Sequence, residues 1–304
     1  MSVKFQIDFR TKKDLKPETN TQHTEEVFFQ GDNGQAVILI HGLTGTPQEM
    51  KFLTNFFHRK GYSVICPQLA NHGQPLEILK DTQWPDFYQS ARQAFMKIKD
   101  SHNLIFVSGL SMGALLALLL AEEFPERISG VSCLSPTLFY DGWNSPWYRC
   151  FLYPLYVVPW LRSFFYFKED PPYGVKNEAV RRLVHKYYSQ AQLNDIKEVG
   201  RYGYPYFPAT LLYQLHILVK HLTEKLENIR VPVQIIQAKE DDMTSPRNAQ
   251  FIYERVKSKT KEIVLLYDSY HVITADQERD KVAAAMERFF IQASNNTAFK
   301  HKNA

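Results

Sequence analysis

The sequence predicts an α/β fold: a doubly wound, mostly parallel β-sheet with an inserted, mainly helical and aromatic-rich cap. Three observations lead to this prediction. Short, β-branched, apolar runs alternate with segments of helical periodicity, as in sheets covered by helices on both faces. The alternation stops between residues 136 and 228. Finally, a serine between two glycines, in "GLSMG", stands where an apolar run turns into an apolar helix.

Six apolar runs are expected to form the central strands, because continuous apolarity is typical of strands buried on both faces. They are residues 36–40, 62–66, 104–107, 128–134, 231–237 and 262–267. The run "VFFQ" at residues 27–30 is expected to add an antiparallel edge strand. Helices are expected at residues 47–60, 84–99, 113–124, 246–258 and 277–293. This organisation divides the chain into a core, residues 1–135 and 229–304, and a cap, residues 136–228.

The composition is that of an ordinary globular chain of 304 residues, with 44% hydrophobic and 22% charged residues. The net charge of +4 is spread along the chain without a basic block, so nucleic acid is not an expected partner. Cys66, Cys133 and Cys150 are odd in number and widely spaced, which argues against a disulfide framework or a zinc site. The first twenty residues lack the apolar run of a signal peptide. A cytoplasmic location is therefore expected, and the oligomeric state is left undefined.

The cap is unusually aromatic. Residues 139–167 hold thirteen Phe, Tyr or Trp side chains in twenty-nine positions, yet the longest uncharged run there has twelve residues, two of them proline. A membrane span needs roughly 20 apolar residues, so three interpretations remain: a second hydrophobic core, a cap that lines an acyl pocket, and a surface that rests on a membrane. The segments 177–190 and 209–229 are expected to be packing helices. His216 and His221 within the second are not expected to bind metal, because no further ligand lies at suitable spacing.

Ser111 in "GLSMG" is the candidate nucleophile. The pattern G-x-S-x-G alone is weak, but here an apolar strand precedes it and an apolar helix follows it, as a nucleophile elbow requires. Gly109 and Gly113 would remove side chains that collide at so tight a turn. The alternative is that Ser111 only caps the helix.

A serine hydroxyl is a weak nucleophile and needs a base, which an acid must orient. In a sheet of this kind the acid and then the base should follow late strands. The acid candidates are Glu240, Asp241 and Asp242, after the strand at 231–237, and His271 follows the last strand. His41 and His72 are expected to shape loops instead.

An ester's tetrahedral intermediate carries an oxyanion, which two backbone N–H groups could stabilise by a few kcal/mol each. Met112, directly after Ser111, should supply one donor. Leu43, in the turn "HGLTG" after an early strand, should supply the other.

These motifs together resemble the small bacterial carboxylesterases and monoacylglycerol lipases of the α/β-hydrolase superfamily. The resemblance rests on "HGLTG", "GLSMG", "QAKEDDMTSP" and above all "SYHVITADQERD", and it covers about residues 36–135 and 231–290. It implies Ser111 as nucleophile, Asp241 as acid, His271 as base, and the N–H groups of Leu43 and Met112 as oxyanion hole. The preference for Asp241 over Asp242 comes from the resemblance alone.

The predicted activity is hydrolysis of acyl esters, such as a monoacylglycerol or lysophospholipid, through an acyl-enzyme. No metal or organic cofactor is required. The same triad would also serve a thioesterase, an acyltransferase or an aminopeptidase. A second class remains, a non-catalytic protein that binds a hydrophobic ligand. The aromatic cap also leaves peripheral membrane contact open.

Overall fold

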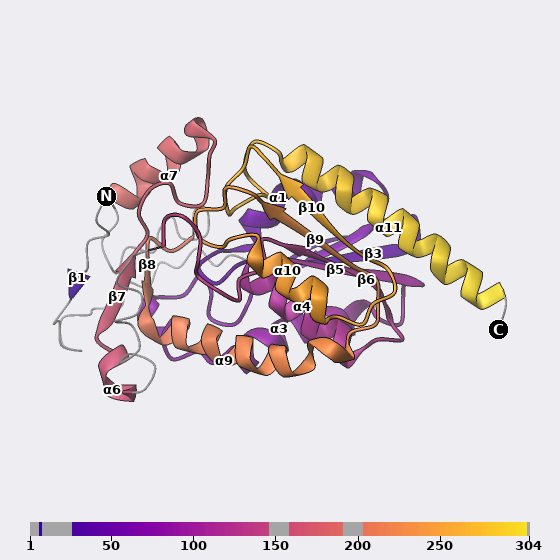
Figure 1. The fold of residues 1–304 in the computed structure, drawn as a ribbon, viewed down its shortest axis with the longest axis horizontal. Helices are drawn as coiled ribbons and strands as arrows, with labels where there is room; N and C mark the ends of the chain where they lie inside the picture. The colour runs from indigo at the N-terminus through magenta and orange to yellow at the C-terminus, as the bar shows by residue number, and fades with distance from the viewer. Residues whose placement is uncertain (1–5, 8–25, 146–157, 191–202, 303–304) are drawn as a thin grey trace.

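A seven-stranded, mostly parallel sheet forms the centre of the computed structural model, which describes residues 6–7, 26–145, 158–190 and 203–302 (Figure 1). The strand order is β10-β9-β6-β5-β3-β4-β2. The strands are β2 (Val27–Phe29), β3 (Gln35–Ile40), β4 (Ser63–Cys66), β5 (Leu104–Leu110), β6 (Ile128–Leu134), β9 (Val233–Ala238) and β10 (Lys261–Leu266). All neighbours pair in parallel except β2, which runs antiparallel to β4 at one edge. The predicted mostly parallel sheet and the predicted edge strand are both confirmed.

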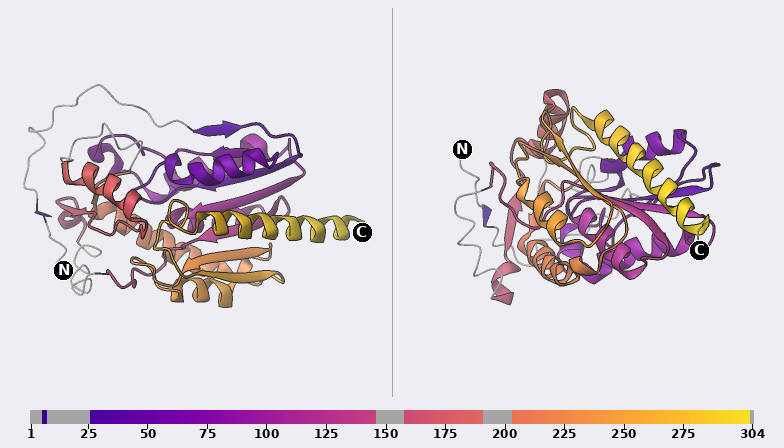
Figure 2. Two further views of the ribbon diagram at one scale, coloured as in Figure 1. Left: turned by 90° about the horizontal axis from the view of Figure 1, so that it is seen from above. Right: turned by 45° about the vertical axis from the view of Figure 1, so that its right-hand side comes forward.

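Helices cover both faces of this sheet (Figures 1 and 2). One face carries α3 (Trp84–Ile98), α4 (Met112–Glu123), α9 (Ala209–Lys225) and α10 (Arg247–Arg255), and the other carries α1 (Lys51–Arg59) and α11 (Arg279–Lys302). Short helical pieces are η2 (Pro47–Met50), α2 (Leu76–Leu79), α6 (Pro159–Arg162) and η4 (Leu226–Asn228). Side chains alternate along β3 between the two cores: Ile38 packs in one and Leu39 in the other. That alternation follows from the two-residue period of a strand.

The expectation that every central strand is buried on both faces is wrong for β10. Its residues are mostly half-buried, and Leu265 is 38% exposed, whereas all residues of β4 and β9 are buried. The reason is its position, since β10 lies at the edge of the sheet and pairs only with β9 among the described strands.

The chain between β6 and β9 combines helices with a small sheet. Strands β7 (Phe165–Lys168) and β8 (Tyr206–Pro208) pair with each other, and β1 (Gln6–Ile7) pairs with β7, all antiparallel. Helix α7 (Glu178–Gln190) follows β7, and Asn177 accepts hydrogen bonds from the N–H groups of Ala179 and Val180 at its start. Part of the predicted aromatic stretch, together with Cys150, lies outside the described residues. No described helix combines the length and apolarity of a bilayer-spanning segment.

Helix α4 lies in the middle of the molecule. Its first ten residues, Met112 to Ala121, are all buried between β5, β6 and α9. A helix that is apolar on every side is typical of such a position. The residue that precedes α4 is therefore held by a fully packed element.

Candidate active site

Ser111 lies at a sharp turn between β5 and α4, with φ 57° and ψ −116°. A positive φ is unfavourable for a residue with a side chain and is tolerated where the surrounding structure enforces it. The Ser111 side chain makes no capping hydrogen bond to the helix. Its Oγ lies 2.8 Å from the Thr137 hydroxyl oxygen instead. The alternative role of Ser111 as a helix cap is therefore wrong.

The glycines on either side of Ser111 permit this turn. A Cβ atom on Gly109 would lie 2.1 Å from the carbonyl carbon of Gly113, and one on Gly113 would lie 2.3 Å from the carbonyl oxygen of Ile40. Both distances are far below van der Waals contact, and the atoms met are backbone atoms that cannot move aside. The sequence prediction for these two glycines is confirmed.

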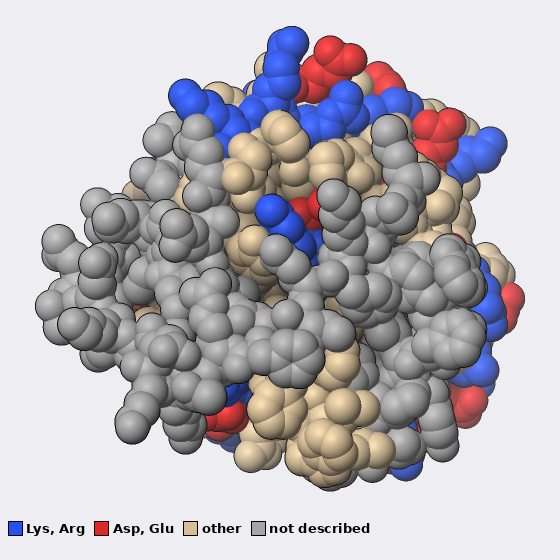
Figure 3. Space-filling model, turned by 90° about the vertical axis from the view of Figure 1, so that its left-hand side faces the viewer, with Lys and Arg blue, Asp and Glu red and all other residues tan. Residues whose placement is uncertain are grey.

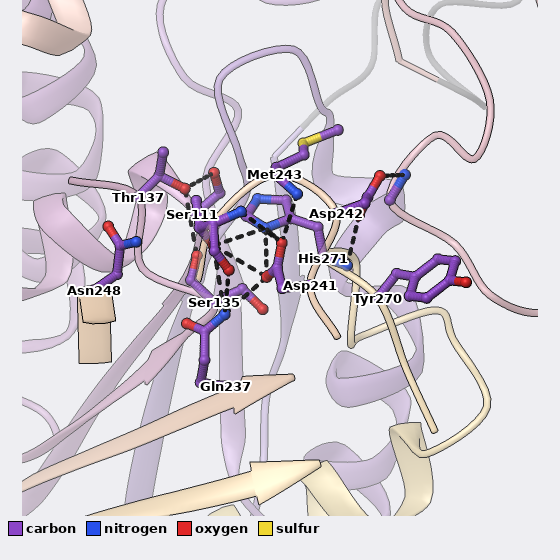
Figure 4. A network of polar contacts seen from close by, with 12 residues as sticks. Ser111, Ser135, Thr137, Gln237, Asp241, Asp242, Met243, Asn248, Tyr270 and His271 are labelled. Carbon is purple, nitrogen blue, oxygen red and sulfur yellow. Dashed lines mark hydrogen bonds and ion pairs between the residues drawn. The ribbon is translucent and has the colours of Figure 1, made fainter. Parts of the chain in front are cut away.

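Asp241 and His271 form a buried pair at the carboxyl ends of β9 and β10 (Figure 4). The Nδ1 atom of the His271 ring lies 2.9 Å from Oδ2 and 3.1 Å from Oδ1 of Asp241. Oδ1 also accepts hydrogen bonds from the N–H groups of Met243 and Thr244, and Oδ2 accepts one from the side-chain amide of Gln237. Every described neighbour of this carboxylate is thus a donor, as an ionised acid requires.

The three acid candidates have different surroundings. Glu240 is exposed and pairs with Lys176. Asp242 is buried and accepts hydrogen bonds from the main-chain N–H groups of His271 and Gly174, not from the imidazole ring. Asp241 alone reaches the imidazole ring.

Burial is the largest single influence on the His271 imidazole and lowers its pKa. The charge and hydrogen bond of Asp241, together with the charges of Asp242 and Glu49, outweigh it, so the pKa of His271 is raised above its ordinary value. These carboxylates favour the imidazolium form, which a general base must pass through during the reaction.

Ser111 and His271 belong to the same cluster in Figure 4. Within the described part of the chain, however, no hydrogen bond joins the Ser111 hydroxyl to the His271 ring, and the hydroxyl is engaged by Thr137. Catalytic hydrogen bonds are often long before substrate binds. The sequence did not point to Thr137, which no motif includes.

The loop after β3 lies beside Ser111, since a Cβ atom on Gly42, the residue before Leu43, would lie 3.6 Å from Cβ of Ser111. The carbonyl oxygen of Gly42 accepts hydrogen bonds from His41 Nδ1, at 2.9 Å, and from the N–H of Gly45, at 3.3 Å. In a trans peptide the Leu43 N–H points the opposite way. Among the described residues, neither this N–H nor that of Met112 donates to a protein acceptor.

His41 and His72 shape this loop, as the sequence predicts. His41 Nε2 accepts a hydrogen bond from the N–H of Leu69, which leaves the proton on Nδ1. His72 Nε2 lies 2.8 Å from the carbonyl oxygen of Leu43. Burial lowers the pKa of both imidazoles, which favours their neutral form.

Two acidic side chains near His271 were not predicted. Glu49 lies in η2, and its Oε2 accepts a hydrogen bond from the N–H of Gly42 at 3.0 Å. Burial raises the pKa of Glu49 to about 7, against the opposing effects of this hydrogen bond and of His271. Burial, with the charge of Asp242 next in size, raises the pKa of Glu169 to about 7. Their role depends on contacts between distant segments, so no local sequence signal marks them.

A comparison with known protein families identifies the fold and chemistry together. Residues 31–278 match the family described as serine aminopeptidase, S33. The chain belongs to this family. The S33 match spans the strand–turn–helix at Ser111 and the loops of Asp241 and His271, and it makes the protein a serine hydrolase of the α/β-hydrolase superfamily, as the resemblance predicts.

Two curated relatives and two solved structures agree with the S33 assignment. The chain is 30% identical over 263 residues to a thermostable monoacylglycerol lipase of Bacillus sp. (strain H-257), covering 86% of this chain and 93% of the relative. It is 25% identical over 260 residues to a carboxylesterase of Bacillus subtilis (strain 168), covering 84% and 91%. A structure from work on the metagenome-derived lipolytic enzymes LipS and LipT superimposes with a TM-score of 0.73 at 25% identity, covering 88% of this chain and 98% of that one. The monoacylglycerol lipase of Paleococcus ferrophilus superimposes with a TM-score of 0.70 at 18% identity, covering 90% and 100%.

Proposed function

We propose that this protein hydrolyses carboxylic esters of medium to long acyl chains, with Ser111 as nucleophile, His271 as general base and Asp241 as the acid that orients it. The observation that carries the proposal is the buried contact between Asp241 and the His271 ring, 2.9 Å long, at the carboxyl ends of the strands, where Ser111 follows β5. The names of the two Bacillus relatives, a monoacylglycerol lipase and a carboxylesterase, support ester hydrolysis as the reaction.

The reaction begins when the Ser111 hydroxyl turns from Thr137 toward His271. The imidazole Nε2 takes the hydroxyl proton as Oγ attacks the ester carbonyl carbon, and Asp241 holds the ring through Nδ1 and stabilises the imidazolium. The N–H groups of Leu43 and Met112 bind the oxyanion of the tetrahedral intermediate. His271 then protonates the departing alkoxide, which leaves an acyl group on Ser111. Water, deprotonated by His271, attacks this acyl-enzyme, and His271 passes that proton to Ser111 Oγ as the carboxylic acid leaves.

A cap function for residues 136–228 belongs to the same proposal. Its support is the position of the small β1-β7-β8 sheet and of α7 beside the end of the main sheet that carries Ser111 (Figure 1). The aromatic composition of the cap favours acyl chains over polar substituents.

The test combines covalent labelling with hydrolysis of p-nitrophenyl esters of two to twelve carbons. We expect a fluorophosphonate probe to label Ser111 and Ser111→Ala to lose essentially all ester hydrolysis, since removal of the nucleophile costs on the order of 10⁶-fold. Ser135→Ala is a matched control, because the Ser135 hydroxyl is buried and has no hydrogen-bond partner in the described structure. Retention of activity in Ser111→Ala would contradict the proposal. An unlabelled wild-type protein would favour a hydrophobic-ligand binder, and preference for a thioester or an aminoacyl amide would favour the related reactions.

Membrane contact through the cap stays a prediction. Trp160 is 67% exposed, Phe164 50% and Leu183 55%, and Lys and Arg side chains gather along the upper edge of the face drawn in Figure 3, where α7 lies in Figure 1. Exposed aromatic and cationic side chains are typical of surfaces that rest on lipid. Co-sedimentation with anionic vesicles should fall in Trp160→Ala, and no binding by the unaltered protein would refute this prediction.

A further inference from the structure

The chain segment before α7 is fastened to the loop that carries His271. The N–H of Val272 donates to the carbonyl oxygen of Gly174 at 2.7 Å. The carboxylate of Asp276 accepts hydrogen bonds from the N–H groups of Lys176, at 2.8 Å, and Asn177, at 2.7 Å, while also accepting one from Tyr270, at 2.8 Å, within the loop. One buried carboxylate thus holds main-chain donors of both segments.

Gly174 is the point at which this segment touches residue 271 itself. Its φ is +69°, a conformation that glycine adopts without cost. A Cβ atom at this position would lie 2.8 Å from Cγ2 of Val272 and 3.2 Å from Cβ of His271. The main chain of the inserted region therefore lies directly against the histidine.

Asp242 joins the two at this point of contact (Figure 4). Its Oδ1 accepts a hydrogen bond from the main-chain N–H of His271, at 3.2 Å, and its Oδ2 accepts one from the N–H of Gly174, at 3.1 Å. The side chain is buried, so these two N–H groups would not find water as a replacement acceptor. Asp241 holds the imidazole ring, whereas Asp242 holds the main chain that carries the ring.

We infer that Asp242 is a positioning residue, which fixes His271 through its main chain and makes that position depend on the seating of the inserted region at Gly174. The inference rests on the proposed role of His271 as general base. It adds a coupling between cap and base: a displacement of residues 174–177 removes one of the two partners of Asp242 and loosens the residue on which proton transfer depends.

The charges around Asp242 come from three sides. Asp241 is its neighbour in sequence, His271 faces it from the base loop, and Glu169 faces it from the inserted region. Burial, followed by the charge of Asp241, raises the pKa of Asp242 to about 6. Lys176, in the segment before α7, forms ion pairs with the surface carboxylates of Glu240 and Asp268. Protonation of Asp242 converts one acceptor oxygen to a hydroxyl, so one of its two main-chain partners is lost in acid.

The decisive variant is Asp242→Asn, because an asparagine keeps the shape but offers one acceptor oxygen where two N–H donors must be satisfied. We expect kcat for p-nitrophenyl butyrate to fall about 10- to 100-fold, the loss that a displacement of about 1 Å can produce, with a smaller change in KM. Removing a negative charge beside His271 should lower the pKa of the imidazole. The acid limb of the pH profile, the fall in kcat/KM as His271 becomes protonated, should therefore move to lower pH. The shift of this limb reports the removed charge, whereas the fall in kcat reports the positioning role: a residue with only a structural role would lower the thermal midpoint and leave kcat of the folded protein unchanged.

Glu240→Gln is the matched control. It removes one negative charge two residues before Asp242. It also removes a surface ion pair with Lys176, which belongs to the segment before α7. Its kcat and acid limb should stay within twofold and 0.2 pH units or so of the unaltered protein, because an exposed pair contributes little. Equal effects in Glu240→Gln and Asp242→Asn would overturn the inference.

Gly174→Ala tests the coupling from the other side without changing any charge. Its Cβ meets Val272, so kcat should fall while the acid limb keeps its position. An unaltered kcat in both folded Asp242→Asn and Gly174→Ala would overturn the inference. If Asp242→Asn does not fold, kcat of Gly174→Ala alone tests the inference, and an unaltered kcat would overturn it. Failure of the proposed function can be told apart from failure of this inference, because the unaltered protein would then not react with the fluorophosphonate.

Discussion

Replacing Asp241 by asparagine would separate the stability of this site from its chemistry. The replacement is nearly isosteric, and its oxygen can keep the two hydrogen bonds from the N–H groups of Met243 and Thr244, each 2.8 Å long. The new NH₂ group would then occupy the position of Oδ2, beside Gln237, Thr244 and His271. Two of these three neighbours can adapt. The Thr244 hydroxyl can turn to accept, and the amide of Gln237 can rotate to offer Oε1, which has no partner in the described structure.

His271 is the neighbour that cannot adapt without loss of function. A donor facing Nδ1 forces that nitrogen to accept, which places the ring proton on Nε2. In that tautomer Nε2 cannot take the proton of Ser111. The expected loss in kcat/KM is about 10⁴-fold, as for a histidine held in the wrong tautomer, or about 5.4 kcal/mol at 1.36 kcal/mol per factor of ten. The loss in stability should be only about 1–2 kcal/mol, for one or two rearranged hydrogen bonds.

The assay is hydrolysis of p-nitrophenyl butyrate by Asp241→Asn, with urea denaturation of the same preparation to measure the free energy of unfolding. Glu240→Gln is again the control, since its carboxyl group is exposed and lies outside this network. A folded Asp241→Asn protein that kept more than about a tenth of the activity would refute the argument that Asp241 sets the tautomer of His271.

Three further predictions follow from the geometry of the site. Because the neutral imidazole is the base and its pKa is raised, kcat/KM should fall about tenfold per pH unit below that pKa, and a pH profile without an acid limb would contradict the role of His271. Glu49→Gln removes a carboxylate that raises the pKa of His271, so the same titration should show its acid limb at lower pH; an unchanged limb would mean that Glu49 is neutral there. Gly113→Ala places a methyl group 2.3 Å from the Ile40 carbonyl oxygen and should lower the free energy of urea unfolding by about 1–3 kcal/mol, whereas an unchanged midpoint would show that the turn can relax.

Much of the main sheet could be predicted from sequence because its strands are apolar throughout. The segment 128–134 coincides with β6, and the predicted antiparallel edge strand at 27–30 corresponds to β2. The exposure of β10 was not predicted, because its run Ile263 to Leu266 is as apolar as a central strand and only the strand order places it at an edge. Short elements such as α2, β7 and β8 were also missed, since three or four residues carry too little periodicity to be recognised.

In the candidate site, too, some residues can be predicted from sequence and others only from the fold. The order of Ser111, Asp241 and His271 along the chain follows from the strands they succeed, and the glycines beside Ser111 follow from the tightness of its turn. Thr137, Glu49 and Glu169 belong to no motif, and they reach the site only because the fold brings their segments together. Asp242 is a candidate acid by sequence. Its contacts with the main chain of His271 and with Gly174 arise from tertiary structure and have no counterpart in the local sequence.

The adjacency of β6 and β9 has a practical consequence. Their parallel pairing, from Val131 opposite Val233 to Leu134 opposite Ile236, closes the sheet between two stretches of chain separated by the inserted region. Ser111 lies on one side of this seam, and Asp241 and His271 lie on the other. A cut within the insertion would therefore yield one polypeptide with Ser111 and another with Asp241 and His271, and it would break no strand of the main sheet. Ester cleavage by the mixed fragments would count reassembled molecules directly, which makes this scaffold suited to a split-enzyme reporter.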